Sequence, residues 1–342
     1  MNACRKIFTA LILNIWLFII AFPNLVFASD VMVWAFPKPD SINARNDQIL
    51  KPEMRVMPES LQRISWATPQ VDVTTQIEAV PQVEVIPAIV GGVAAYRGEF
   101  PEFTALYVLW TDGYLYPWGC GGTLISANKV MTAAHCTYGV HPSWFYVHTN
   151  HYSDYEYIPA NQFIPASYKN EHPHFNTSTL NNDISILTLN RNATTPVGHI
   201  YGGNRSLTGY MSTIIGLGYL NNAGSIPTYL QKVNVPVVSN ATCSSVYGSD
   251  ITPSMLCAGY SSGGVGFCNG DSGGPLFVNY QGLRAQAGII SWYTYECGYP
   301  YYYDVTARTS ALINFIKQYA PAANIVMDPP FNPAILFPIL FE

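Results

Sequence analysis

The sequence predicts an all-β protein, built as a barrel or a sandwich, and two observations lead to this fold class. Charged residues make up 11% of the chain and aromatic residues 14%, with 24 Tyr and 26 Gly. This composition favours short strands and turns over long surface helices, which require many Lys and Glu. Apolar segments with strand-like alternation also recur at fairly even spacing between turn-forming residues. These segments cover residues 103–109, 120–126, 184–189, 213–217, 231–238, 276–278 and 285–292.

One helix is expected, close to the carboxyl end of the chain. The apolar residues that recur there at a helical spacing and share one helix face are Leu312, Phe315, Ile316 and Tyr319. Thr309 or Ser310 is expected to cap its first turn. With 342 residues, the chain is long enough for one large domain or two smaller ones.

The charge balance excludes some classes of partner. The net charge is −5, from 16 Lys and Arg against 21 Asp and Glu. These charges form no basic stripe along the sequence. We therefore expect no binding to nucleic acid and no electrostatic attraction to an anionic membrane surface.

Residues 1–28 are predicted to be a secretory signal peptide. Arg5 and Lys6 precede a long apolar run, and small residues up to Ala28 stand where a signal peptidase reads. The alternative is an uncleaved membrane anchor, but Pro23 and Asn24 interrupt the run short of the roughly 20 residues that a bilayer requires. We therefore expect a secreted protein without a stable membrane span.

Residues 29–88 are rich in proline and show no sustained apolar period, so the segment is poorly suited to form a core of its own. It is either a flexible linker or a pro-segment. Cleavage between Ala88 and Ile89 would give an apolar residue a new ammonium group, for which Asp271 is the natural buried partner. The plainer alternative makes Ile89-Val-Gly-Gly92 an ordinary strand end. We predict a pro-segment over residues 29–88.

Ser272 lies in the stretch Cys268-Asn-Gly-Asp-Ser-Gly-Gly-Pro275 and is the candidate nucleophile. A serine hydroxyl is a weak nucleophile at neutral pH, so it needs a neighbouring base and a site that stabilises the oxyanion formed by its attack on a carbonyl. Gly270 has no side chain, so its backbone can turn sharply and point its N–H at the same place as the N–H of Ser272.

His135 and Asp183 are the candidate partners of this serine. His135 stands beside Cys136 in Thr132-Ala-Ala-His-Cys136, and Asp183 stands at the entrance of an alternating strand, where its carboxylate can turn inward. A single His or Asp is more often structural, but here His135, Asp183 and Ser272 follow one another along the chain. The pair His172 and His174 has no suitably spaced acidic or cysteine partner, so no metal and no cofactor are expected.

Four motifs therefore occur in one order. They are Ile89-Val-Gly-Gly92, Thr132-Ala-Ala-His-Cys136, Asp183-Ile-Ser-Ile-Leu187 and Gly270-Asp-Ser-Gly-Gly-Pro275. Together they resemble the trypsin- and chymotrypsin-like serine peptidases over roughly residues 89–320. The resemblance implies two six-stranded antiparallel β-barrels with a carboxyl-terminal helix and with the catalytic residues in the cleft between the barrels.

The resemblance also implies a role for each candidate residue. His135 takes the proton of Ser272 and later returns it to the leaving amine, and Asp183 orients the imidazole and stabilises its cationic form. The N–H groups of Gly270 and Ser272 bind the oxyanion.

Six of the seven cysteines remain once Cys4 is assigned to the leader. No pair has the Cys-x-x-Cys spacing of a zinc or redox site, so disulfides in an exported protein are expected. The resemblance implies the pairs Cys120–Cys136, Cys243–Cys257 and Cys268–Cys297.

The resemblance places the substrate pocket at Gly266, Phe267, Ser291, Trp292, Tyr293 and Tyr301. Trypsin-like members carry Asp at the position of Gly266, so trypsin-like specificity is not expected. Tyr293 and Tyr301 stand where the family usually has Gly and would fill the pocket walls. We expect a shallow pocket for small apolar side chains, or one whose tyrosines move away when substrate binds.

The predicted function is that of a secreted serine endopeptidase, made as a zymogen and acting on protein or peptide substrates as a monomer. Because Ala88 precedes the cleavage point, the activator would be an elastase-like protease or the protein itself. The alternative is a protease-like binding protein or adhesin with a Tyr-rich surface, although such proteins usually lose a triad residue or an oxyanion glycine, and this chain keeps them. An esterase would use the same triad.

Residues 321–342 form a Pro-rich apolar tail, in which five prolines argue against a transmembrane helix. The sequence leaves open whether this tail docks on the surface, carries a sorting signal or is removed. Asn-x-Ser/Thr sequons begin at Asn176, Asn192, Asn204 and Asn240 and would carry glycans only in a eukaryotic secretory pathway.

Overall fold

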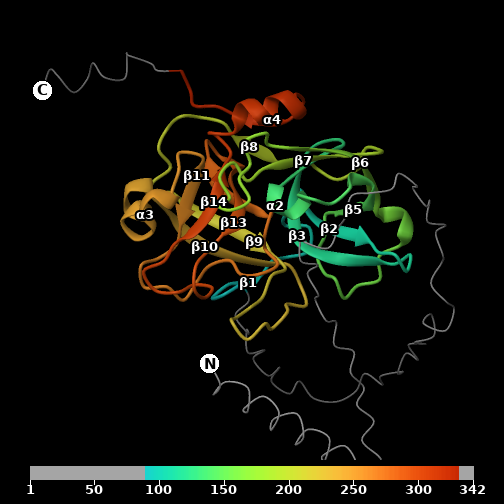
Figure 1. The fold of residues 1–342 in the computed structure, drawn as a ribbon, viewed down its shortest axis with the longest axis horizontal. Helices are drawn as coiled ribbons and strands as arrows, with labels where there is room; N and C mark the ends of the chain where they lie inside the picture. Colours follow the sequence, from blue (N-terminus) through green and yellow to red (C-terminus); the bar gives the residue numbers. More distant parts are fainter. Residues whose placement is uncertain (1–88, 331–342) are drawn as a thin grey trace, which may run out of the picture. The chain divides into compact units, whose positions relative to one another are not determined.

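The computed structural model describes residues 89–330. The predicted signal peptide, the predicted pro-segment and residues 331–342 of the tail lie outside the described residues. The described chain consists mostly of β-strands with few helices, as predicted. Two barrels follow one another along the chain, the first drawn in cyan to green and the second in yellow to orange (Figure 1).

The first barrel closes through the strand order β2-β3-β4-β7-β6-β5, with every neighbouring pair antiparallel. Its strands are β2 (Phe103–Leu109), β3 (Leu115–Ser126), β4 (Lys129–Thr132), β5 (Phe145–Thr149), β6 (Ile164–Glu171) and β7 (Ser185–Leu189). Alternate side chains point inward and form a core that includes Leu106, Leu124, Phe145, Val147 and Leu187.

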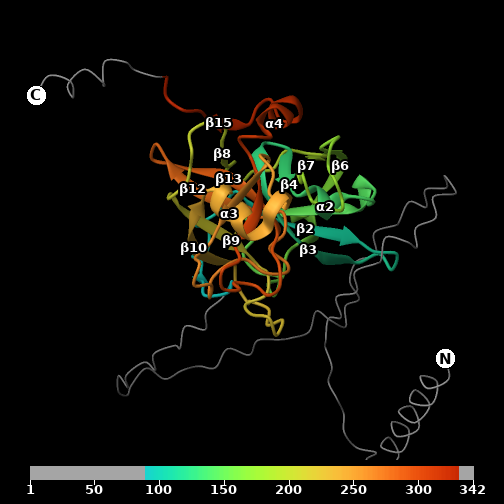
Figure 2. The same cartoon turned by 60° about the vertical axis from the view of Figure 1, so that its left-hand side comes forward.

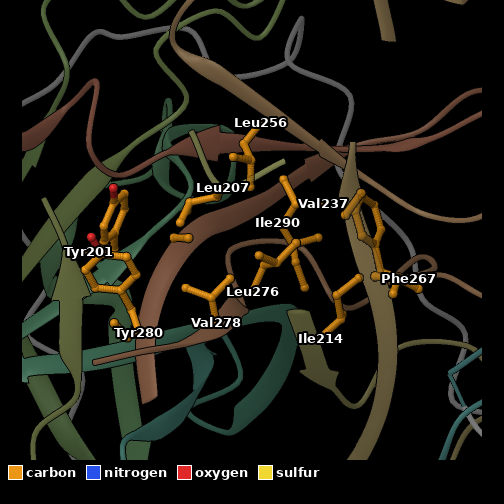
Figure 3. Packing of buried hydrophobic residues seen from close by; sticks show 14 of the residues in the cluster. Tyr201, Leu207, Ile214, Val237, Leu256, Phe267, Leu276, Val278, Tyr280 and Ile290 are labelled. Carbon is orange, nitrogen blue, oxygen red and sulfur yellow. The ribbon is translucent and has the colours of Figure 1, made fainter. Parts of the chain in front are cut away.

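The second barrel has the order β12-β9-β10-β11-β14-β13 and is closed by antiparallel pairing of β12 with β13. Its strands are β9 (Met211–Gly216), β10 (Gln231–Val238), β11 (Met255–Ala258), β12 (Pro275–Tyr280), β13 (Leu283–Trp292) and β14 (Asp304–Arg308). Figure 3 shows how Ile214, Leu276, Val278 and Ile290 meet in its interior. The predicted pair of six-stranded antiparallel barrels is thus confirmed.

Three short strands extend this second sheet. β1 (Val93–Ala94) pairs with β10, while β8 (His199–Tyr201) lies parallel to both β13 and β15 (Asn324–Val326). β15 is formed by residues that were predicted to belong to the tail, so the first part of that segment is built into the sheet.

The predicted carboxyl-terminal helix is confirmed as α4 (Ile313–Tyr319), which packs beside the barrels (Figure 1, Figure 2). Its buried residues join a cluster with residues of both barrels, including Ile125, Met131, Ile289 and Ala307. The predicted cap is wrong, because α4 begins after Leu312 and has no side-chain cap. The hydroxyl of Thr309 instead lies 2.8 Å from the carbonyl oxygen of Tyr201.

The remaining helical segments are short. They are α2 (Ala134–Thr137), η3 (Pro142–Trp144), η4 (Ala160–Gln162), α3 (Asn240–Tyr247) and η5 (Gly248–Asp250). Within residues 89–330, no helix is long and apolar enough to cross a bilayer.

An ion pair also connects the two barrels. Arg284 of β13 donates two hydrogen bonds to the carboxylate of Glu102, from Nε at 2.7 Å and from a terminal nitrogen at 2.9 Å. Glu102 is only 4% exposed and directly precedes β2. Such a two-pronged pair holds the barrels at a defined angle as well as a defined distance.

Candidate active site

Asp183 and His135 are held together by the first barrel. Asp183 lies just before β7 and is fully buried, while His135 lies in α2, directly after β4. Because β4 and β7 are paired strands, the two residues meet at the same edge of the sheet. The backbone N–H of His135 donates to Asp183 Oδ1 at 2.9 Å, and the ring Nδ1 lies 2.7 Å from Oδ2.

A third residue completes this arrangement from the second barrel. Ser291 Oγ donates to Asp183 Oδ2 at 2.6 Å. Ser291 lies where the register of β13 with β14 shifts between Ile290 and Trp292, an irregularity of the kind that turns a side chain out of its regular direction. The carboxylate of Asp183 therefore accepts bonds from both barrels.

These contacts change the basicity of His135. Burial lowers the pKa of the imidazole, but the charge of Asp183 and the hydrogen bond to it act in the opposite direction and prevail, so the pKa is raised above its ordinary value. The side chain keeps 25% of its surface exposed. The imidazole can therefore take up a proton from the outside while its Nδ1 is held by a carboxylate.

Ser272 belongs to the second barrel but lies against the first. Its carbonyl oxygen accepts a hydrogen bond from the N–H of Gly121 in β3 at 2.8 Å. A Cβ atom added to the neighbouring Gly273 would lie 2.2 Å from Thr132 Oγ1 and 3.1 Å from the nitrogen of Ala133. The backbone of the Ser272 loop thus contacts the residues that lead into α2 and His135.

The hydroxyl of Ser272 makes no hydrogen bond with His135 in the described part of the chain. The other ring nitrogen of His135 lies 3.7 Å from Cys136 Sγ. Bonds between a nucleophile and its base are often long without substrate and shorten in the bound complex. The structure therefore joins His135 to Asp183 and brings the backbone of Ser272 close to them.

The backbone at Gly270 has the form that the candidate oxyanion site needs. Its φ is +96°, a conformation that favours glycine, and an added Cβ would lie 2.9 Å from the Cα of Gly218. The N–H groups of Asp271 and Gly273 donate to Cys268 and Ile290, whereas those of Gly270 and Ser272 donate to no residue between 89 and 330. Two N–H groups of the loop are thus available to an incoming oxygen.

Asp271 is fully buried behind this loop. Its carboxylate accepts hydrogen bonds from the N–H groups of Gly218 at 2.7 Å and Cys268 at 2.8 Å. Burial raises the pKa of Asp271 to about 7, against the lowering effect of these two bonds. None of the ion pairs within the described residues includes Asp271.

Ile89, the first described residue, is buried in the core of the second barrel. The next residue, Val90, accepts a hydrogen bond from the N–H of Gly266 at 3.1 Å. The segment at the predicted cleavage point therefore lies alongside the segment predicted to form the pocket.

The structure contains three disulfides with the same partners that the family resemblance implies. They join Cys120 to Cys136, Cys243 to Cys257 and Cys268 to Cys297. Cys120, His135 and Cys136 lie close enough to one another for a metal site, but both sulfur atoms are consumed in a disulfide and cannot act as thiolate ligands.

Some of the other predicted pocket residues lie near one another. Phe267 is buried and packs edge-on against Tyr293, whose hydroxyl donates to Asn269 Oδ1 at 3.0 Å. Ser291 and Trp292 end β13. Tyr301 is 71% exposed, and its backbone N–H donates to the carbonyl oxygen of Ser261 at 2.9 Å.

Sequence reasoning missed Asp304, which occupies the space beside Gly266. A Cβ atom added to Gly266 would lie 2.6 Å from Asp304 Oδ2, and the same oxygen accepts a hydrogen bond from the N–H of Phe267 at 2.9 Å. The expectation about specificity considered position 266 alone, whereas the structure places a carboxylate from β14 beside that position. Sequence reasoning identified no strand at residues 304–308 and thus no reason to select Asp304, which is the first residue of β14.

Asp304 is 5% exposed, and burial raises its pKa to about 8, with a smaller contribution from the nearby charge of Asp271.

A separate open cavity of about 490 Å³ lies on the first barrel, around His148, Tyr152 and Gln162. That cavity is lined by none of the predicted site residues.

Comparisons with known proteins agree with the geometry. The family model described as Trypsin matches residues 89–316. Trypsin-1 of Astacus astacus is 36% identical over 243 residues, which is 67% of this chain and 98% of that protein. A trypsin of Saccharopolyspora erythraea is 35% identical over 67% of this chain and 97% of its own length. Trypsin I-P1 of Gallus gallus is 34% identical, over 67% and 88% respectively.

Proposed function

The chain belongs to the trypsin family of serine-type endopeptidases, and on that premise we propose that it is a secreted endopeptidase, made as a zymogen, that cleaves peptide bonds through Ser272, His135 and Asp183. The observation that carries the proposal is the double hydrogen bond between His135 and Asp183 beside the Ser272 loop. Its substrates are proteins or peptides, as for the family.

In the proposed mechanism, Ser272 Oγ attacks the carbonyl carbon of the substrate while the free ring nitrogen of His135 takes the hydroxyl proton. Asp183 holds the other nitrogen in its protonated form and stabilises the imidazolium. His135 then donates the proton to the leaving amine, and an acyl-enzyme remains on Ser272. Water attacks this ester with the same base and releases the second product.

The oxyanion formed in each attack would be bound by the N–H groups of Gly270 and Ser272. Losing one such donor in related sites costs about 2.7–4 kcal/mol of transition-state stabilisation. The positive φ of Gly270 and the free state of both N–H groups support this assignment.

Activation is proposed to follow cleavage between Ala88 and Ile89. Asp271 is a buried carboxylate without a cationic partner among the described residues, and Ile89 is already buried in the same barrel core. A new ammonium group on Ile89 would supply the missing charge. The family model begins at the same residue, which supports this boundary.

Secretion and a monomeric state are also part of the proposal. Three disulfides support an oxidising compartment, and the predicted leader supplies a route to it. The cleavage before Ile89 would be made by an elastase-like protease or by the protein itself.

The test uses the full chain, purified and processed before Ile89 as established by amino-terminal sequencing. A serine-reactive phosphonate is expected to label the processed protein at Ser272. Ser272→Ala should remove the label, whereas Ser212→Ala, which deletes a buried hydroxyl bonded to Val235 far along the barrel, should keep it. If the processed and folded protein takes no label, the alternative of a binding protein with this fold is favoured.

Self-activation has its own test. Purified Ser272→Ala protein should remain unprocessed if the protein cleaves itself. Unchanged processing of this variant would exclude self-cleavage and assign the step to another protease.

A further inference from the structure

The helix that carries His135 is too short to be stable by itself. α2 has four residues and no side-chain cap at its amino end, and its turn is closed by a backbone bond from the N–H of Tyr138 to the carbonyl oxygen of Ala134. A single helical turn is unstable in isolation, because fixing its backbone costs more free energy than the first hydrogen bond returns. The position of His135 therefore depends on the contacts that hold α2 from outside.

Side chains of two strands hold the carboxyl end of α2. The last carbonyl groups of a helix have no partner within the helix itself. In α2, the carbonyl oxygen of Cys136 accepts a hydrogen bond from Trp118 Nε1 of β3 at 2.6 Å, and that of Thr137 accepts one from Lys169 Nζ of β6 at 2.6 Å. Cys136 is also joined to β3 through its disulfide with Cys120. Both β3 and β6 thus restrain this end of the helix.

Lys169 is held in turn by Glu171. Its Nζ lies 2.7 Å from Glu171 Oε1, and the same oxygen accepts a hydrogen bond from the hydroxyl of Thr137 at 2.8 Å. Residues two apart in a strand point to the same face, so both β6 side chains reach the same residue of α2. The two side chains are only 18% and 21% exposed, and salt screens such a pair less than an open surface pair. We call these mutual contacts of Thr137, Lys169 and Glu171 the α2 clamp.

The α2 clamp also reaches the strand that follows Asp183. The hydroxyl of Thr137 lies 3.0 Å from Oγ of Ser185, which is the first residue of β7 and stands two residues after Asp183. Glu171 is the partner of Ser185 in the register of β6 with β7. Thr137, Ser185 and Asp183 are all fully buried. One network therefore supports both His135 and Asp183.

We propose that Lys169 and Glu171 are positioning residues of the active site, whose ion pair holds the end of α2 so that the backbone N–H and the ring of His135 keep their hydrogen bonds to Asp183. The inference rests on the proposed function, because it assigns the pair to the orientation of the general base. Neither residue belongs to the four motifs that indicated the site. A pair that served stability alone could be exchanged for apolar side chains of similar volume at little cost, whereas a positioning pair could not.

The experiment uses variants that leave the net charge of the protein unchanged. Lys169→Met/Glu171→Met removes both charges of the α2 clamp, and Thr137→Val removes its hydroxyl while keeping the shape of the side chain. The matched control, Arg97→Met/Glu156→Met, removes a more exposed ion pair outside the α2 clamp. The measured quantity is the rate at which an alkyl fluorophosphonate labels Ser272 between pH 5 and 9, in folded protein processed before Ile89.

Both clamp variants should label about 10- to 100-fold more slowly than the wild type, the loss expected when a catalytic group is displaced. The charge of Asp183 and the hydrogen bond to it raise the pKa of His135, so the midpoint of the rate profile should also move to lower pH when that contact loosens. In Ser272→Ala protein that carries the same changes, NMR should show the Nδ1 proton of His135 exchanging faster with water. The control should retain the wild-type rate, midpoint and proton exchange.

The outcomes separate this inference from the proposed function. Clamp variants that fold and keep the wild-type rate, midpoint and proton exchange would refute the role of the pair, while labelling of the wild type would leave the endopeptidase proposal standing. If neither clamp variant folds, the network serves the fold as a whole, and the specific role is refuted as well. If the processed wild type takes no label, the proposed function itself fails, and unchanged exchange of the Nδ1 proton in the variants would separately refute the α2 clamp.

Discussion

Asp183 receives two hydrogen bonds from His135, one from the backbone N–H and one from the ring. The backbone bond fixes the position of His135, and the ring bond fixes the orientation of its imidazole. With Ser291 bound to the same carboxylate from the other barrel, the orientation of the imidazole depends on how the two barrels are packed.

Changing Asp183 to Asn should therefore disable the enzyme without unfolding it. The amide nitrogen of Asn would face Nδ1 as a donor and favour the wrong tautomer of His135. We expect kcat to fall by about 10⁴-fold, the loss that this change causes in a related triad. Asp154→Asn is a matched control, because Asp154 also pairs with a histidine, His151, but in the first barrel away from the predicted site. A similar loss in both variants would contradict the assignment.

The uncleaved chain should lose stability as the pH rises. Asp271 has a pKa raised from 3.8 to about 7 in the folded chain, so the folded state holds a proton that the unfolded state releases. This contribution is fully present below about pH 4 and is lost as the pH rises through about 7, with a size on the order of 4 kcal/mol. Chemical unfolding of Ser272→Ala protein from pH 4 to 8 measures it.

The control for this experiment is the double variant Ser272→Ala/Asp271→Asn, whose stability should depend less on pH over the same range. A new ammonium on Ile89 should reverse the effect, because it favours the ionised carboxylate. Parallel pH profiles for both uncleaved variants would show that Asp271 does not titrate as stated.

Two of the disulfides should contribute similarly to the stability of the protein but differently to its activity. The bridges Cys243–Cys257 and Cys268–Cys297 close loops with sequence separations of 14 and 29. Replacing either pair by Ala should cost about 3–4 kcal/mol of the free energy of unfolding. Below the melting temperature, loss of the first pair should leave kcat/KM nearly unchanged. Loss of the second should lower it strongly, because that bridge anchors the Ser272 loop. Equal activities would contradict this division.

The strands that sequence reasoning identified are apolar runs bounded by turn-forming residues, of which β10 alternates regularly between buried and more exposed positions. β2 and β10 have the predicted bounds, and β13 and β12 differ by a few residues at their ends. β6 was missed because a register shift between Ala166 and Tyr168 breaks its alternation. β8 and β15 are three residues long and depend on parallel pairing between distant segments, which leaves no local pattern.

The candidate site likewise contains some residues that the sequence predicts and others that it does not. The order of the motifs was enough to propose His135, Asp183 and Ser272, because each motif is local. The pocket could not be derived in this manner, because the distance between Gly266 and Asp304 depends on how β14 pairs with β13 after the irregularity at Ser291. Pro300 suggested Tyr301 as a wall residue; Tyr301 is 71% exposed, whereas Asp304, three residues further on, accepts the N–H of Phe267.

The hydrogen bond from Gly266 to Val90 has a further consequence. It connects the backbone beside the pocket to the segment that would carry the new amino terminus. Where docking of that terminus increases the affinity for a pocket occupant, thermodynamic reciprocity requires that the occupant increases the affinity for the docked terminus by the same factor. A tight pocket ligand should thus draw even the intact precursor towards the conformation of the processed enzyme.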